Sequence, residues 1–348
     1  MLFRQLFDLE SFTYTYLLAD EATRQALLID PVFEQFERDR ALVRELGLTL
    51  RFTLETHVHA DHVTAAWRLR DALGSRIVLS RRSGAEGADL YVDDGDVVGA
   101  GAVALTVRAT PGHTNGCVTY VTTDRRVAFT GDALLIRSAG RTDFQQGDPS
   151  VLYRSIKERI FTLPDDCLLY PGHDYGGRTV TTVAEEKRWN PRVGGEASAE
   201  DFTGYMKNLG LPHPKQIDAA VPANVKCGKP EPGALAAAPA WGPVVRTFGG
   251  VLEVDPVWVA EHRREVTILD VREPAELTGD LGCIDGSLHI PLGELRARLA
   301  EVPGGKPVVC ICRSGRRSAQ ASLILEKAGV RDVANSPGGM IRWRAVGL

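Results

Sequence analysis

With 348 residues the chain is too long for one ordinary hydrophobic core, so its length predicts two domains, a larger and a smaller one. It is 44% hydrophobic and 25% charged, as globular proteins are, and its net charge of −4 with no long basic run argues against a nucleic-acid partner. No segment approaches about 18 uninterrupted apolar residues, so neither a membrane span nor a signal peptide is expected, and the predicted location is the cytoplasm.

Short strands alternating with helices are predicted for the first half of the chain. In chain order they are two strands within 15–29 around a turn at Asp20, a helix over 36–46, a strand over 51–54, a helix over 63–73, strands over 103–108, 118–122 and 127–129, and a helix from the Asp148-Pro149 cap to residue 160. Polar residues follow several of these strands, where packed sheets commonly present functional groups.

The second half predicts a linker followed by a compact α/β domain. Residues 229–246 are rich in Pro, Ala and Gly and lack an apolar period, as linkers do. Beyond them, strands are expected over 266–271 and 307–311 and helices over 292–299 and 318–328, the last with Ser318 as its N-cap.

Seven potential metal ligands lie at or near the predicted strand ends of the first domain. They are His57, His59, Asp61, His62, His113, Asp132 and His173. Imidazoles and carboxylates gathered so densely are typical of ligands around a cation. The string from His57 to His62 reads His-x-His-x-Asp-His, and with it the chain resembles the metallo-β-lactamase superfamily. That resemblance implies an αββα sandwich with the metal at one rim.

The ligands by themselves leave two kinds of metal site open. All seven are enough for a dinuclear zinc site of the glyoxalase II type, in which a bridging hydroxide attacks a glutathione thioester. Alternatively, His57, His113 and Asp132 form a two-histidine, one-carboxylate set around a single Fe(II), with positions left for O₂ and a substrate sulfur.

Longer strings outside the ligands resemble the persulfide dioxygenases. They are Gly140-Arg141-Thr142-Asp143-Phe144-Gln145-Gln146-Gly147, Ile160-Phe161-Thr162-Leu163-Pro164-Asp165-Asp166-Cys167, His173-Asp174-Tyr175 and Val221-Pro222-Ala223-Asn224. The resemblance implies one Fe(II) per chain at His57, His113 and Asp132. It also implies an outer shell that hydrogen-bonds the ligands and water, made of His59, Asp61, His62 and His173.

The same resemblance implies that glutathione persulfide and O₂ are the substrates and that sulfite and glutathione are the products. Arg141 can pair with a glutathione carboxylate, and Tyr175 can donate its hydroxyl to the peptide portion of the substrate. The competing roles are a domain-internal ion pair for Arg141 and a packing role for Tyr175.

A second chemistry is predicted where the strand over 307–311 gives way to the helix over 318–328. The loop between them consists of Cys312, Arg313, Ser314, Gly315, Arg316 and Arg317. Backbone amides, a helix N-terminus and arginines all favour an anion, so Cys312 is expected to be a reactive thiolate.

With Leu269-Asp270-Val271-Arg272-Glu273-Pro274 and Gly338-Gly339-Met340-Ile341-Arg342-Trp343, this loop resembles a single rhodanese domain. The resemblance implies that Cys312 carries a persulfide between a donor such as thiosulfate and an acceptor such as glutathione or sulfite. The family's usual Gly-His-Ile-Pro-Gly-Ala segment is altered here to Cys283-Ile284-Asp285-Gly286-Ser287, which affects local contacts there.

The sequence thus predicts an α/β chain with a metallo-β-lactamase sandwich in 1–228, a linker in 229–246 and a small rhodanese domain with a parallel sheet in 247–348. The expected function is oxidation of glutathione persulfide coupled to sulfane-sulfur transfer between thiosulfate and glutathione. The alternatives are a dinuclear zinc thioester hydrolase with an accessory rhodanese, or a C-terminal domain that only binds and delivers persulfide. The direction of transfer, channelling between the sites and homo-oligomer formation stay open.

Overall fold

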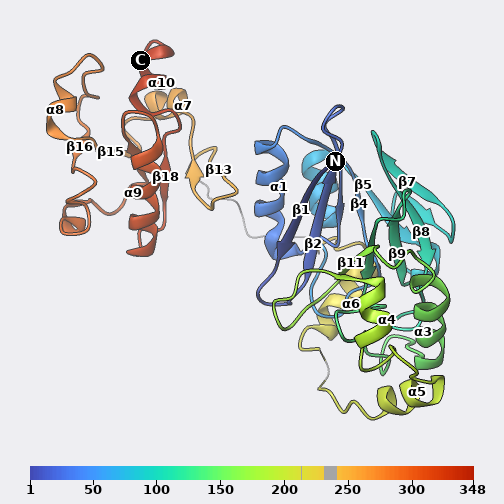
Figure 1. Ribbon diagram of the computed structural model, residues 1–348. Coiled ribbons are helices and arrows are strands. Elements are labelled where there is room, and N and C mark those ends of the chain that lie inside the picture. Colours follow the sequence, from blue (N-terminus) through green and yellow to red (C-terminus); the bar gives the residue numbers. More distant parts are fainter. Residues whose placement is uncertain (213, 231–240) are drawn as a thin grey trace. The chain divides into compact units, whose positions relative to one another are not determined.

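The computed structural model of the chain describes residues 1–212, 214–230 and 241–348 (Figure 1). The chain divides into two compact units, Met1–Pro232 and Gly233–Leu348, called here the first and the second domain. Residues 231–240 of the predicted linker lie outside the described residues. No helix in the described part of the chain is long and apolar enough to cross a membrane.

The first domain begins with a six-stranded sheet in the order β1-β2-β3-β4-β5-β6. Its strands are β1 (Leu2–Phe7), β2 (Tyr14–Ala19), β3 (Gln25–Ile29), β4 (Thr49–Leu54), β5 (Arg76–Ser80) and β6 (Leu90–Val92). The strands β1 to β3 are antiparallel, and β3 to β6 run parallel. The helices α1 (Phe36–Glu45) and α2 (Ala66–Leu73) cover the outer face, and 3₁₀ turns lie at Phe33–Gln35 and Arg81–Ser83.

The second sheet has the order β12-β11-β10-β9-β8-β7. Its strands are β7 (Val97–Ala100), β8 (Val103–Ala109), β9 (Val118–Thr122), β10 (Val127–Gly131), β11 (Leu168–Pro171) and β12 (Thr181–Thr182). Its outer face is covered by α3 (Pro149–Ser155), the π-helical turn Ile156–Ile160, α4 (Val183–Trp189) and α5 (Ala199–Lys207).

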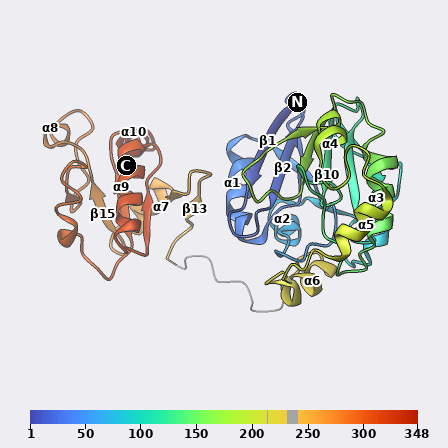
Figure 2. The same ribbon diagram turned by 60° about the horizontal axis from the view of Figure 1, so that its bottom comes forward.

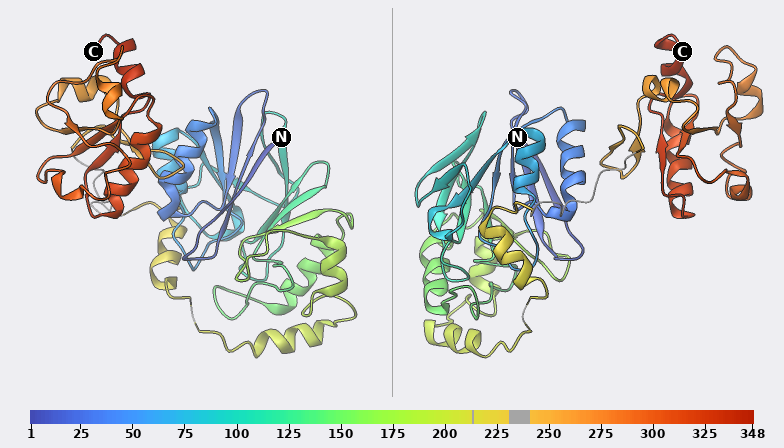
Figure 3. Two further views of the ribbon diagram at one scale, coloured as in Figure 1. Left: turned by 60° about the vertical axis from the view of Figure 1, so that its left-hand side comes forward. Right: turned by 180° about the vertical axis from the view of Figure 1, so that it is seen from behind.

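The two sheets pack face to face because successive strand residues point to opposite faces and both faces are apolar. Leu18 and Leu27 point into the core between the sheets, whereas Leu17 and Leu28 point to α1 and α2. Figure 3 shows the resulting layers of helix, sheet, sheet and helix. The predicted αββα sandwich is confirmed.

A last helix of the first domain, α6 (Ile217–Val225), packs beside α2 at the end of the first sheet (Figure 2). Val221 and Val225 contact a small apolar cluster that contains Val58, Ala66 and Cys227. The C-terminal half of α6 is therefore held against the segment that carries the histidine-rich loop.

The second domain is built on a sheet in the order β13-β14-β18-β17-β15-β16. The strands are β13 (Val245–Arg246), β14 (Leu252–Glu253), β15 (Thr267–Asp270), β16 (Leu288–His289), β17 (Val308–Ile311) and β18 (Val333–Asn335), parallel except for β13. The helices are α7 (Pro256–Glu261), α8 (Pro274–Leu277), α9 (Arg316–Lys327) and α10 (Gly339–Ala345), with a 3₁₀ turn at Leu299–Glu301. Separate apolar clusters cover the two faces of the sheet, so the predicted small α/β domain with a parallel sheet is confirmed.

Three local expectations differ from the structure. The helix predicted over 292–299 is wrong: these residues form turns in which most backbone bonds span three residues, and Gly293 disfavours a helix. The helix after the cysteine loop begins at Arg316 with Gly315 as its N-cap, so Ser318 lies inside the helix. The predicted linker extends to 246, whereas Trp241 and Val244 pack against the second domain and Val245–Arg246 form β13.

Candidate metal centre and reactive cysteine

Three buried side chains converge at one rim of the sandwich. His57 follows β4, His113 follows β8 and Asp132 follows β10, so one is supplied by the first sheet and two by the second. One ligand atom from each lies within 4.8 Å of the other two. Gly172 lets the next loop approach closely, because a Cβ there would lie 2.7 Å from Oδ1 of Asp132.

Hydrogen bonds fix the ring nitrogens of both histidines. The Thr56 hydroxyl donates to Oδ2 of Asp30 at 2.8 Å, so its oxygen accepts from Nδ1 of His57 at 2.9 Å. Nδ1 of His113 donates to the backbone carbonyl of Arg141 at 2.6 Å. Each ring therefore keeps the lone pair on Nε2 for a ligand, as in many metal sites. Burial lowers the pKa of His57 well below its ordinary value, which favours the neutral imidazole that a metal needs.

Asp132 presents one carboxylate oxygen to this point and uses the other elsewhere. Its Oδ2 lies 3.7 Å from Nε2 of His113, while its Oδ1 accepts from Nδ1 of His173 at 2.7 Å. Burial opposes ionisation of Asp132, but the three nearby histidines, His173 foremost, outweigh it and lower the pKa. Burial likewise disfavours charge on His173, yet Asp132 and Asp61 raise its pKa well above the ordinary value.

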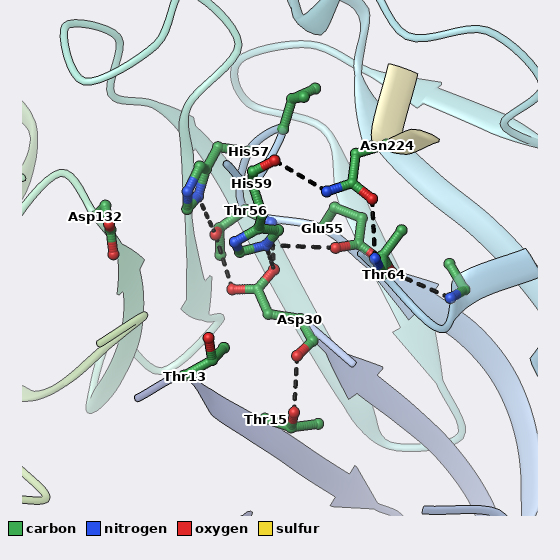
Figure 4. A network of polar contacts seen from close by, with 12 residues as sticks. Thr13, Thr15, Asp30, Glu55, Thr56, His57, His59, Thr64, Asp132 and Asn224 are labelled. Carbon is green, nitrogen blue, oxygen red and sulfur yellow. Dashed lines mark hydrogen bonds and ion pairs between the residues drawn. The ribbon is translucent and has the colours of Figure 1, made fainter. Parts of the chain in front are cut away.

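His59 follows the loop from His57, and its Nε2 faces two carboxylates, Asp30 and Glu55 (Figure 4). Its Nε2 lies 3.2 Å from Oδ1 of Asp30 and 3.5 Å from Oε2 of Glu55. Burial opposes a charged ring, but the two carboxylates raise the pKa of His59 to about 10. His59, Asp30 and Glu55 thus form a buried charged group behind the loop, and the Thr64 hydroxyl donates to Glu55 at 2.5 Å.

The other predicted outer-shell residues form a hydrogen-bonded group. Oδ2 of Asp61 accepts from Nδ1 of His62 at 2.8 Å and from Nε2 of His173 at 2.9 Å. Thr13, which no sequence motif singles out, donates its hydroxyl to the same carboxylate oxygen at 3.1 Å.

A single divalent ion fits the donor set of His57, His113 and Asp132. Two Nε2 lone pairs and one carboxylate oxygen form the two-histidine, one-carboxylate set that suits Fe(II) with open positions. Among the remaining donors, Nδ1 of His59 and Nε2 of His62 have no hydrogen-bond partner among the described residues, and one atom each of His59, Asp61 and His62 also lies within 4.8 Å of the other two. The other nitrogens of these two rings, together with Asp61 and His173, are engaged in hydrogen bonds or ion pairs.

Asn224 on α6 holds the histidine-rich loop through three buried hydrogen bonds (Figure 4). Its side chain donates to the carbonyls of His59 at 2.9 Å and His62 at 2.8 Å, and accepts from the Thr64 amide at 2.9 Å. The sequence pointed to Asn224 only as part of the Val221–Asn224 string. Its role as an anchor of the loop follows from these contacts, whose partners lie some 160 residues away along the chain.

The two predicted glutathione contacts lie in different surroundings. The Arg141 guanidinium is 15% exposed, pairs through two 2.6 Å bonds with Asp143, and donates to the carbonyls of Leu211 and Pro212. A substrate carboxylate would have to share this guanidinium with Asp143. The Tyr175 side chain is 69% exposed, and its ring stacks on His173 with centroids 6.2 Å apart.

Cys312 lies in the loop between β17 and α9 of the second domain. Its buried Sγ accepts from the Gly315 amide at 3.2 Å and from the Ser318 hydroxyl at 3.3 Å. Burial opposes ionisation, but these donors outweigh it and lower the pKa of the Cys312 thiol. On β17 no hydrogen bond from a described residue reaches the thiol of the neighbouring Cys310, and burial raises its pKa.

The arginines of the loop fall into two groups. Arg317 pairs with both oxygens of Glu276 at 2.6 and 2.8 Å, which ties α9 to α8. Arg313 and Arg316 are exposed, as is Ser314, and no ion pair involves either arginine in the part of the chain that the structure describes. The loop that holds Cys312 therefore carries two exposed positive charges, which attract anionic substrates.

Comparison with known proteins agrees with this division of the chain. Residues 9–173 match the metallo-beta-lactamase superfamily, and residues 255–346 match the rhodanese-like domain. The persulfide dioxygenase ETHE1 (mitochondrial) of Homo sapiens is 56% identical over 235 residues, which cover 67% of this chain and 91% of the human protein.

Solved structures give the same result. The crystal structure of ETHE1 from Myxococcus xanthus matches with a TM-score of 0.64 at 57% identity and covers 66% of this chain and 100% of that one. A metallo-beta-lactamase structure from Staphylococcus aureus covers 97% of this chain and 98% of its own with a TM-score of 0.62, but at 22% identity it shows the fold alone.

The fold and the rim histidines place the first domain in the metallo-β-lactamase superfamily. Within it, the chain belongs to the ETHE1 persulfide dioxygenase family, and it carries a rhodanese-like domain in addition.

Proposed function

We propose that the first domain oxidises glutathione persulfide with O₂ to glutathione and sulfite, using one Fe(II) held by His57, His113 and Asp132. The observation that carries this proposal is the convergence of three ligand atoms: Nε2 of His57, Nε2 of His113 and one carboxylate oxygen of Asp132. Family membership supports the same reaction. The ferrous ion, when bound, supplies the binding of O₂ and the redox chemistry.

The protein's own residues hold and orient the reactants in this proposal. Thr56 and the Arg141 carbonyl fix the two histidine rings, and His173 fixes the Asp132 carboxylate. Arg141 and Tyr175 are proposed to hold a carboxylate and the peptide portion of glutathione. One persulfide, one O₂ and one water give one glutathione and one sulfurous acid, which ionises to sulfite.

The zinc thioester hydrolase is less well supported. A dinuclear site needs a carboxylate that reaches both ions, whereas Oδ1 of Asp132 is engaged by His173. Nε2 of His59 faces Asp30 and Glu55, so only its Nδ1 is left for such a site.

For the second domain we propose sulfane-sulfur transfer through Cys312. The thiolate would attack the outer sulfur of thiosulfate, sulfite would leave, and a glutathione thiolate would take the sulfur from the cysteine persulfide as glutathione persulfide. The donors around Sγ and the free Arg313 and Arg316 support an anionic nucleophile with an anionic substrate.

An oxygen electrode tests the first reaction directly. Purified chain supplied with glutathione persulfide should consume one O₂ for each sulfite formed, and His113→Ala should lose both the metal and the uptake. Thiosulfate transfer should survive in that variant, because the two sites lie in separate compact units. Absence of O₂ uptake by the iron-loaded chain would refute the proposal.

A further inference from the structure

The hydroxyl of Thr13 lies at the centre of the outer-shell group. It lies 3.1 Å from Oδ2 of Asp61, 3.2 Å from Nδ1 of His62 and 3.0 Å from Nε2 of His173. The Thr13 side chain is fully buried. One small neutral group is thus at hydrogen-bond distance from three strong metal donors at once.

Those three side chains and Asp132 are among the seven ligands that a dinuclear site would use, and a second ion held by them would lie between Asp61, His62 and His173. A zinc ion requires nitrogen and oxygen ligands at about 2.0–2.2 Å, so it would have to sit inside the ring of donors that the hydroxyl now fills. His62 also has a buried Nε2 with no hydrogen-bond partner among the described residues. The ligands for a second ion are therefore present, and the space between them is taken.

The hydroxyl cannot easily move away, because the backbone on both sides of it is fixed. Thr13 forms a β-bridge with His173, the Tyr14 amide donates to the Gly172 carbonyl at 2.8 Å, and the Asp8 amide donates to the Thr13 carbonyl at 2.9 Å. A β-branched side chain also has few χ1 alternatives. The segment that carries Thr13, just before β2, is thus tied to the loop that carries His173.

We propose that Thr13 limits this site to a single metal ion by filling the position of a second one. Its hydroxyl donates to Asp61 and accepts from a ring nitrogen, so it also holds these side chains in a hydrogen-bonded arrangement that has no need of a cation. The inference rests on the proposed single-ion site and names Thr13 as the residue that prevents binding of a second ion.

Zinc titration of the metal-free, full-length chain tests this role, with ions counted per chain by calorimetry and elemental analysis. Wild type should bind one Zn²⁺ and Thr13→Ala should bind two. Thr13→Val keeps the volume and should bind one. The matched control is Thr15→Ala, because Thr15 is buried two residues further along, in β2, and its hydroxyl donates to the Asp30 carbonyl. Adding Asp61→Asn to Thr13→Ala should restore one ion.

Two Zn²⁺ in the wild type would overturn the inference, and so would one Zn²⁺ in a Thr13→Ala variant with native circular dichroism. If Thr13→Ala does not fold, the wild type and Thr13→Val still test the inference. Two bound Zn²⁺ ions in either protein would show that the Thr13 side chain does not fill the position of a second ion. A wild type that binds one ion but consumes no O₂ would contradict the proposed dioxygenase and leave this inference standing.

Discussion

Ser318 is predicted to lower the pKa of the Cys312 thiol through one hydrogen bond. Its hydroxyl donates to Sγ at 3.3 Å from inside α9, and the Gly315 amide is a second donor at 3.2 Å. A hydrogen bond to a charged group contributes about 1.5–3 kcal/mol, and 1.36 kcal/mol corresponds to one pKa unit. Ser318→Ala should therefore raise the pKa of Cys312 and lower the ratio of thiolate to thiol at a given pH by roughly tenfold to a hundredfold.

The assay is the pH dependence of Cys312 alkylation by iodoacetamide, followed by peptide mass spectrometry. A Cys283→Ser background removes the one exposed cysteine of the chain. Ser318→Ala should move the midpoint upward, so that sulfur transfer is slow near neutral pH and recovers at alkaline pH. The matched control is Ser322→Ala, because Ser322 is buried one turn further along α9 and its hydroxyl donates to the Ala319 carbonyl. A midpoint unchanged from that control would refute the role of Ser318.

Three further predictions concern the substrate contacts, the histidine-rich loop and the sulfur carrier. Arg141→Ala should raise KM for glutathione persulfide about tenfold to a hundredfold with near-normal iron content. Asp143→Ala should lower KM, because it frees the Arg141 guanidinium for the substrate carboxylate. An unchanged KM in both variants would contradict substrate binding by Arg141. Asn224→Ala leaves three buried backbone groups unpaired, each at a cost of about 1–3 kcal/mol of folding free energy, so Tm and iron retention should fall. The control Asn208→Ala, at the exposed end of α5, should change neither. Cys312→Ser should abolish sulfur transfer from thiosulfate and keep O₂ uptake from added glutathione persulfide. When thiosulfate and glutathione are supplied instead, only the wild type should consume O₂. No O₂ uptake by the wild type under these conditions would show that sulfur transfer runs toward thiosulfate.

Much of the fold was predictable because its signals are local. Strands β2, β3, β4, β8, β9 and β10 lie within about one to three residues of their predicted ranges, since short apolar runs with turn residues between them specify buried strands. The prediction of a helix over 292–299 was wrong because the same spacing of apolar residues also occurs in consecutive turns, which here fully bury only Leu295 of this segment. Short edge strands such as β12 and β13 are set by their partners and leave little trace in the sequence.

The candidate metal residues were predictable because histidine and aspartate were concentrated at strand ends. Thr13 and Asn224 were not, since one threonine and one asparagine are ordinary residues whose partners lie about 50 to 160 residues away along the chain. Ser318 shows the same limit: its residue type indicated an N-cap, whereas a helix start two residues earlier turns its hydroxyl toward Cys312. Tertiary contacts assign these roles, and sequence patterns do not.

The metal content of the full-length chain, purified without oxygen, tests the central claim most directly when it is measured beside O₂ uptake on the same samples. The account predicts about one iron per chain, the number that a single two-histidine, one-carboxylate set can hold, with uptake proportional to iron across preparations. Two zinc ions per chain, together with hydrolysis of a glutathione thioester and no O₂ uptake after iron loading, would contradict it.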